Sequence, residues 1–380
     1  MFTEIKNIES IKSLNKFEDR VFYCTQGNSL INKNFVVQNI EGHSYVFKEG
    51  RLFFFDTSGN LHVYEEKTGT TNALLDYTLN FRAIKGDKVL LRYRRTDNNL
   101  YYSSKELYLY DLNSGKIIQC FYSLENIVIA IWHGDVLIGH KLDKTNYKKN
   151  IYSYSTITDT FLWRYDVTEI GRWREWYPDG QEFPGEIRKF IGVWQEELLV
   201  ALTNHTIIAL DIHTGELKRK WRDVPEEKWR KIPFIGSSNQ AIAIPYPEGT
   251  VLDSEGGKLV GASGIFYWEI DLHTGALLFE EFSAEFGTPL DKVKYSFMGG
   301  RTPALSGDHL FLIGERYYSA KNGNDSEVIA FNRKTHTIDW RHTFPLEEGV
   351  QFGLQSPVLE GNRLYVLDTS GTLHIFERTN

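Results

Sequence analysis

The chain has 380 residues, 41% of them hydrophobic, which is enough for one large core or two ordinary ones. With 43 Lys and Arg against 50 Asp and Glu, its net charge of −7 argues against nucleic acid as the main partner. Two cysteines exclude a disulfide framework, and no apolar run approaches the roughly 18 residues of a membrane-spanning helix. The first twenty residues carry charges throughout, unlike a signal peptide. We therefore expect a cytoplasmic protein without a membrane partner.

A self-similar phrase recurs along the chain: a short apolar strand, an acidic or polar turn, and a second strand that often carries Trp. The clearest copies are residues 207–215 and 266–275. In chain order the phrases end at Gly69, Gly115, Asp159, Gly215, Gly275, His336 and Asn380. Seven units spaced 44 to 61 residues apart predict a repeat architecture in the size range of propeller blades.

Another strand is expected before each phrase. These strands are residues 51–56, 88–93, 135–139, 197–202, 240–244, 309–314 and 362–368. In the turns, the carboxylates of Asp211 and Asp271 are suited to accept backbone N–H groups two residues on, and Gly215 and Gly275 are suited to a positive φ. Helical periodicity is nearly absent, so strands dominate the prediction.

The predicted fold is all-β: a seven-bladed β-propeller of four-stranded antiparallel blades, residues 43–380, whose strands we name A to D. The phrase forms strand C and the turn into D. The chain ends where the seventh D strand should begin, so we predict that an N-terminal strand from residues 1–42 pairs with the last blade and closes the ring within the same domain. Residues 20–25 and 34–37 are candidates, and a disordered N-terminal arm is the alternative.

The phrase resembles the pyrroloquinoline-quinone (PQQ)-like repeat of quinoprotein-like propellers. The resemblance is carried by Ala209-Leu210-Asp211, by Thr214-Gly215 and by Trp221. In that family this Trp packs between blades, which implies the same role for Trp163, Trp221 and Trp340. The resemblance implies a fold and no cofactor, since the adjacent cysteines that some quinone enzymes place over their cofactor are missing. Non-enzymatic members use the repeat for protein contacts.

Six long insertions are predicted to project from one face, because B–C and D–A connections open on the same side of an up-and-down blade. They are residues 96–105, 245–263 and 315–327 between strands B and C, and residues 166–186, 222–231 and 283–295 between D and A. We call this side the long-loop face. Long loops on a rigid scaffold commonly carry binding sites.

The insertion at residues 166–186 is the most distinctive, because loop Trp, Tyr and Arg are residue types that anchor interfaces. The predicted protein-binding residues are Arg172, Trp173, Arg174, Trp176, Tyr177, Trp229, Arg230, Arg316, Tyr317 and Tyr318. Six carboxylates against two arginines give residues 166–186 a local charge of −4, which favours a neutral or basic protein partner. The alternative is a loop that folds back over the propeller mouth.

No motif for catalysis or metal binding stands out: H-x-x-x-H, H-E-x-x-H and G-x-S-x-G are all missing. We therefore expect a monomeric, non-catalytic propeller without metal or cofactor that binds another protein, as a scaffold or as an immunity or antitoxin-like binder. The alternative is an enzyme, or a small-ligand or glycan-binding protein, with its site in the central funnel.

Overall fold

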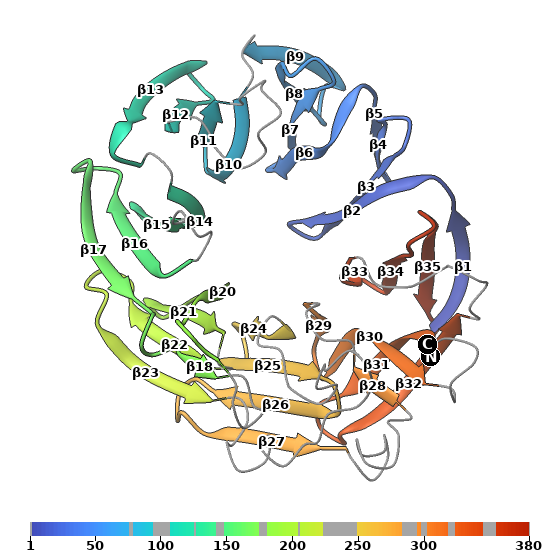
Figure 1. The fold of residues 1–380 in the computed structure, drawn as a ribbon. Coiled ribbons are helices and arrows are strands. Elements are labelled where there is room, and N and C mark those ends of the chain that lie inside the picture. The colour runs from blue at the N-terminus through green and yellow to red at the C-terminus, as the bar shows by residue number, and fades with distance from the viewer. Residues whose placement is uncertain are drawn as a thin grey trace. The chain divides into compact units, whose positions relative to one another are not determined.

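The computed structural model describes residues 2–75, 79–93, 107–124, 127–141, 148–174, 181–203, 206–222, 249–282, 295–297, 302–317, 324–344 and 355–379. These residues form β-strands joined by turns, with one short 3-10 helix, η1 (Tyr122–Leu124) (Figure 1). The chain divides into two compact units. The first comprises Ser10–Asp166 with His213–Gly215, and the second comprises Met1–Glu9, Val167–Ile212 and Glu216–Asn380.

The first unit holds four antiparallel sheets of four strands each, in chain order. They are β2 (Ile11–Phe17), β3 (Arg20–Thr25), β4 (Leu30–Asn32) and β5 (Phe35–Val37); β6 (Ile40–Lys48), β7 (Arg51–Asp56), β8 (Leu61–Glu65) and β9 (Thr70–Leu75); β10 (Leu79–Lys85), β11 (Lys88–Tyr93), β12 (Leu107–Asp111) and β13 (Lys116–Phe121); and β14 (Ile127–His133), β15 (Val136–Lys141), β16 (Asn150–Ser155) and β17 (Thr160–Asp166).

The second unit also holds four antiparallel sheets and a small hairpin, β18 (Trp173–Arg174) with β19 (Glu182–Phe183). Three sheets are β20 (Ile187–Trp194), β21 (Glu197–Leu202), β22 (Thr206–Asp211) and β23 (Leu217–Arg222); β24 (Val251–Asp253), β25 (Lys258–Ser263), β26 (Phe266–Asp271) and β27 (Leu277–Glu281); and β28 (Tyr295–Phe297), β29 (Ala304–Ser306), β30 (His309–Tyr317), β31 (Asn324–Asn332) and β32 (Thr337–Phe344). The fourth combines β33 (Val358–Glu360), β34 (Arg363–Leu367) and β35 (Leu373–Arg378) with β1 (Phe2–Ile8).

The described residues therefore form eight blades, and the predicted number of seven is wrong. The missed blade is β2–β5, in the stretch that was reserved for a closing strand. Its strands β4 and β5 have three residues each and are joined by the short turn Lys33–Asn34, so it lacks the acidic turn and final Gly of the repeated phrase. Its core is nevertheless ordinary, because Phe22, Cys24 and Leu30 are fully buried against the next sheet.

An N-terminal strand completes the last sheet, as the sequence predicted, but it is neither of the suggested segments. Strand β1 pairs antiparallel with β35, from Phe2 opposite Arg378 to Ile8 opposite Leu373. Residues 20–25 form β3 instead, and residues 34–37 overlap β5.

One B strand was also assigned wrongly. Residues 240–244 lie outside the described residues, and the strand that pairs with the phrase strand β26 is β25. Residues 245–263 therefore contain β24 and β25 and are not a B–C insertion. Within this range Asp253 ends β24, and residues 254–257 form the tight turn into β25.

The phrase turns share one backbone geometry. The last residue donates its N–H to the residue four positions earlier at Gly69, Gly115, Asp159, Gly275 and His336. All five, together with Gly215, have a φ between 57° and 76°. In the turn after β26, Asp271 Oδ1 accepts the N–H groups of His273 and Thr274 at 2.9 and 2.7 Å, as expected for this carboxylate.

Tryptophans of the D strands pack against neighbouring turns and strands, as the resemblance implied. In the second unit, Trp221 Nε1 donates to Gly275 O at 3.2 Å, and Trp340 Nε1 donates to Phe2 O at 3.0 Å. In the first unit, the Trp163 ring lies so close to Gly215 that a Cβ there would approach it to 2.6 Å.

Candidate functional site

The insertion between β17 and β20 has a closely packed base. Gly171 and Gly185 lie back to back: a Cβ on Gly185 would lie 2.3 Å from Val167 O and 2.5 Å from Gly171 Cα. Gly171 N donates to Val167 O at 2.9 Å, and Gly185 N donates to Thr168 O at 2.8 Å. Only glycine fits at these two positions, which bring the two ends of the insertion together.

A side chain at the B–C connection of the same blade fixes this base. The Thr203 hydroxyl donates to Gly171 O at 3.1 Å and accepts the Glu186 N–H at 3.0 Å. Thr203 N also donates to Glu186 O at 3.0 Å, and the residue is almost fully buried. The D–A and B–C connections therefore meet at one end of this sheet, and hairpin β18–β19 projects from a fixed root.

Arg172 lies at the start of the hairpin between two carboxylates. Its guanidinium forms ion pairs with Glu169 and, at 3.5 Å, with Glu182. The hydrogen bond and charge of Glu169 raise the pKa of Arg172, and Glu182 adds to this. All three side chains are exposed, so this triad orients the loop more than it stabilises the protein.

The structure describes only part of the predicted binding set. Arg172 is exposed, as a contact residue requires, although Glu169 and Glu182 already engage its charge. The backbones of Trp173 and Arg174 form β18, and those of Arg316 and Tyr317 lie in β30. The predicted residues Trp176, Tyr177, Trp229, Arg230 and Tyr318 lie outside the described residues, as does the insertion at residues 96–105.

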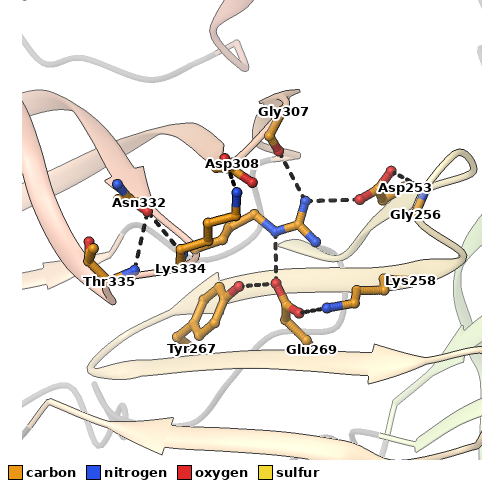
Figure 2. Close-up of polar contacts among 11 residues, drawn as sticks. Asp253, Gly256, Lys258, Tyr267, Glu269, Gly307, Asp308, Asn332, Lys334 and Thr335 are labelled. Carbon is orange, nitrogen blue, oxygen red and sulfur yellow. Dashed lines mark hydrogen bonds and ion pairs between the residues drawn. The ribbon is translucent and has the colours of Figure 1, made fainter.

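A buried charge network in the second unit was not predicted from the sequence. Glu269 on β26 accepts hydrogen bonds from Arg333 Nε at 2.7 Å, from Lys258 Nζ at 2.7 Å and from the Tyr267 hydroxyl (Figure 2). Arg333, in the turn after β31, also donates to Asp253 Oδ2 at 2.9 Å and to Gly307 O at 3.2 Å. It thus connects two neighbouring blades.

The charges in this network are balanced. Burial alone would raise the pKa of Glu269, but hydrogen bonds from Lys258, Tyr267 and Arg333 outweigh that effect and hold the pKa below its usual value. Burial together with the hydrogen bond to Glu269 raises the pKa of Tyr267. Since both oxygens of Glu269 already accept hydrogen bonds, we interpret the cluster as a structural connection between blades and not as an acid–base site.

Metal centres and membrane-spanning helices are both missing from the described residues. No group of three or more His, Cys, Asp or Glu side chains there has a geometry that could hold a metal ion. None of the helical segments found in that part of the chain has the length and apolar character needed to cross a bilayer.

The sequence matches no protein-family profile and no curated protein. Solved structures with a similar fold do exist. BamB from Moraxella catarrhalis, a PQQ-like repeat β-propeller, aligns over 100% of this chain and 98% of its own with a TM-score of 0.54 and 13% identity. The C-terminal WD40 domain of Sif2 aligns over 100% and 99% with a TM-score of 0.59 and 12% identity. Saccharomyces cerevisiae Sqt1 aligns over 100% and 98% with a TM-score of 0.57 and 13% identity.

At 12 to 13% identity these alignments show the fold alone. Together with the four-stranded antiparallel sheets, they identify the chain as a β-propeller with eight blades.

Proposed function

We propose that this chain is a non-catalytic β-propeller that binds another protein through its long-loop face. The observation that carries the proposal is the closely packed base, or root, of the insertion at residues 166–186, where its two ends meet. Gly171, Gly185 and Thr203 hold a hairpin whose first strand contains the Trp173 backbone, and Trp176 lies in sequence between its two strands. A fixed root lowers the entropy lost when a loop binds, because the loop is already held near one position.

The partner in this proposal is a neutral or basic protein. Residues 166–186 carry six carboxylates against two arginines, a local charge of −4, and the side chains of Glu169 and Glu182 are well exposed. A negative potential at the root attracts basic surfaces and repels acidic ones. The similarity to BamB and to WD40 domains supports a scaffold role only by analogy of fold.

We further propose that the repeats are of the PQQ-like type. The Ala-Leu-Asp and Thr-Gly elements around Asp211, the Trp221 contact with Gly275 and the similarity to BamB support this assignment. WD40 domains align equally well, so the repeat type rests on the sequence phrase.

The test is quantitative capture from extracts of the source cell. The intact chain is compared with the double variant Trp173→Ala/Trp176→Ala and with Gly185→Ala, which disturbs the root without removing an aromatic ring. We expect one or more proteins to be captured by the intact chain and reduced at least tenfold with both variants. The control is Val36→Ala, an exposed substitution on β5, far from the insertion along the chain.

Retention of every captured protein by both variants would contradict the assignment of the site. Loss with Trp173→Ala/Trp176→Ala but not with Gly185→Ala would show that the rings act without the fixed root.

A further inference from the structure

We propose that the first unit carries a carboxylate-binding site at His62, which accepts an aspartate or glutamate side chain of a partner protein. The site lies at the B–C turn of the blade β6–β9 and is independent of hairpin β18–β19, which belongs to the second unit. A repeated sequence points to it. Residues 56–62 read D-T-S-G-N-L-H, residues 368–374 read D-T-S-G-T-L-H, and no other stretch of the chain has this pattern.

The two copies fold into the same turn. In each, the aspartate N–H donates to the carbonyl oxygen four residues on at 3.0 Å, and the aspartate Oδ1 accepts the N–H of that residue at 2.9 or 2.8 Å. Nε2 of His62 lies 2.9 Å from Asp56 Oδ2, and Nε2 of His374 lies 3.0 Å from Asp368 Oδ2. Because the same ring nitrogen contacts the same carboxylate oxygen, both rings present Nδ1 at the same place relative to their own sheets.

The two histidines differ at this second ring nitrogen. Nδ1 of His374 lies 2.8 Å from Glu4 Oε1 on β1, so that ring is held between two carboxylates. Nδ1 of His62 has no hydrogen-bond partner among the described residues. Glu4 lies on the D strand opposite the residue two positions after His374, and the residue in that place beside His62 is Thr71. The blade β6–β9 thus has the histidine and its aspartate without the second carboxylate.

Short strands in the neighbouring blade leave this nitrogen accessible. In the second unit, the blade that packs on the His374 side has outer strands β31 and β32 of nine and eight residues, and His342 on β32 lies 3.9 Å from Glu4. In the first unit, the blade that packs on the His62 side has outer strands β4 and β5 of three residues each. The His62 side chain is accordingly 21% exposed, against 12% for His374. Ala73, opposite His62 on β9, is small and exposed, so a carboxylate from outside can reach Nδ1.

A carboxylate at Nδ1 requires a second proton on the ring. Asp56 is an acceptor and fixes one proton on Nε2, so Nδ1 donates to a ligand only when the imidazole of His62 is positively charged. The two carboxylates around His374 require the same of that ring. Histidine takes up its second proton near neutral pH. The site therefore binds a carboxylate together with a proton, and the affinity should rise as the pH falls from 8 to 6.

Asp56 is the carboxylate that pairs with His62, and the groups around them are mostly uncharged. These are Phe54 on β7, Tyr64 on β8, Thr71 and Ala73 on β9, and Phe35, Val37 and Asn39 of the neighbouring blade. Glu41 follows the residue opposite Asp56 on β6, whereas Lys48, Arg51, Glu65 and the ion pair Arg20–Glu66 gather at the other end of the sheet. Protonation of the His62 ring therefore cancels the repulsion that Asp56 alone would exert on a carboxylate.

The test follows the ring signals of the eleven histidines by NMR, with the His62 signal assigned from His62→Gln. The probes are the capped peptides Gly-Glu-Gly and Gly-Gln-Gly and acetate, at matched ionic strength. At pH 6 we expect the glutamate peptide to shift the His62 signal saturably, about tenfold more tightly than the glutamine peptide, and to bind about tenfold more weakly at pH 8. Acetate should bind more weakly than the glutamate peptide, since the peptide backbone can also contact the outer strand β9. The His374 signal should not respond, because Glu4 fills its site.

Two substitutions exchange the roles of the two blades. Thr71→Glu places a glutamate where β1 has Glu4 and should abolish the response of His62, whereas Thr71→Gln should preserve it. Glu4→Ala should open the site in the second unit, so that His374 responds to the glutamate peptide.

Equal binding of the two peptides, or an unchanged His62 response in Thr71→Glu, would overturn the proposal. So would a His374 signal that stays silent in Glu4→Ala while the amide signals of β1 are retained. Binding of acetate as tight as that of the glutamate peptide would overturn the assignment to a protein partner, since the ligand would then be a small carboxylic acid.

Discussion

Arg333 Nε lies 2.7 Å from Glu269 Oε1, although the two residues are 64 positions apart in neighbouring blades and each side chain is only 9% exposed. A buried ion pair is costly to desolvate and costly to break. Its geometry therefore matters more to stability than that of the many exposed pairs on this protein.

Removing one partner of this pair should destabilise the protein strongly. Arg333→Met leaves Glu269 buried without one of its three donors, and we expect a loss of about 3 kcal/mol in the free energy of unfolding. Glu269→Met alone should have a similar effect, whereas the double variant should lose less than the sum, because neither charge is then left alone. Lys334→Ala, in the same turn but exposed, should leave the unfolding midpoint unchanged. Additive losses in urea unfolding would contradict direct coupling.

The attachment of the N-terminal strand should depend on its first described side chain. The Phe2 ring lies 5.4 Å from that of Phe311 and 5.3 Å from that of Trp340, and the residue is 9% exposed. Phe2→Ala should cost about 3 kcal/mol and raise amide exchange across β1 and β35. Ile5→Ala is the matched control, since Ile5 is 47% exposed at a bulge of the same strand. Equal exchange in the two variants would show that Phe2 does not anchor the strand.

The sequence predicted the repeating part of this fold because the phrase leaves a local signature. Strands β22 and β26 and their turns follow directly from Asp211, Asp271 and the glycines that close the turns. The blade β2–β5 was missed because its short turn needs neither an acidic residue nor Gly. The contact between Arg333 and Glu269 could not be predicted either, since it depends on packing between blades, which no local pattern encodes.

The candidate site, too, could be predicted only in part from the sequence. The aromatic and basic residues of the insertion at residues 166–186 were visible in the sequence as an unusual loop composition. The root that Gly171, Gly185 and Thr203 form was not visible in the sequence. The two glycines approach each other only when the folded chain brings both ends of the insertion together. A Gly near each end of a long insertion is the sequence signal that was available.

Alanine substitutions at two turn glycines should distinguish the stability cost of backbone strain from that of a steric clash. Gly69 has a φ of 69° and open space at its Cβ position, so Gly69→Ala should cost only the left-handed strain, about 1 kcal/mol. Gly215 has a φ of 72°, and an added Cβ would also meet the Trp163 ring at 2.6 Å, so Gly215→Ala should cost more. Trp163→Leu should recover part of the extra loss in the Gly215→Ala background. Equal losses for the two glycine variants in thermal unfolding would show that the ring moves aside freely.

Stability should decrease as the pH falls, and His140 should account for much of the decrease. Burial of the ring, with Lys148 nearby, lowers the pKa of His140 to about 4. An unfolded histidine titrates near 6.5, so between about pH 6.5 and 4 the unfolded chain binds a proton that the folded chain does not. At pH 5 the loss is roughly 2 kcal/mol relative to pH 8.

The measurement for His140 is the free energy of urea unfolding at pH 8 and pH 5, for the intact chain and for His140→Gln. The variant should lose clearly less stability between the two values. Some decrease should remain, because burial also lowers the pKa of His342. Comparison within each protein cancels the direct cost of the substitution at pH 8. An equal decrease in both proteins would mean that the native state protonates His140 without penalty, and the burial argument for this ring would then fail.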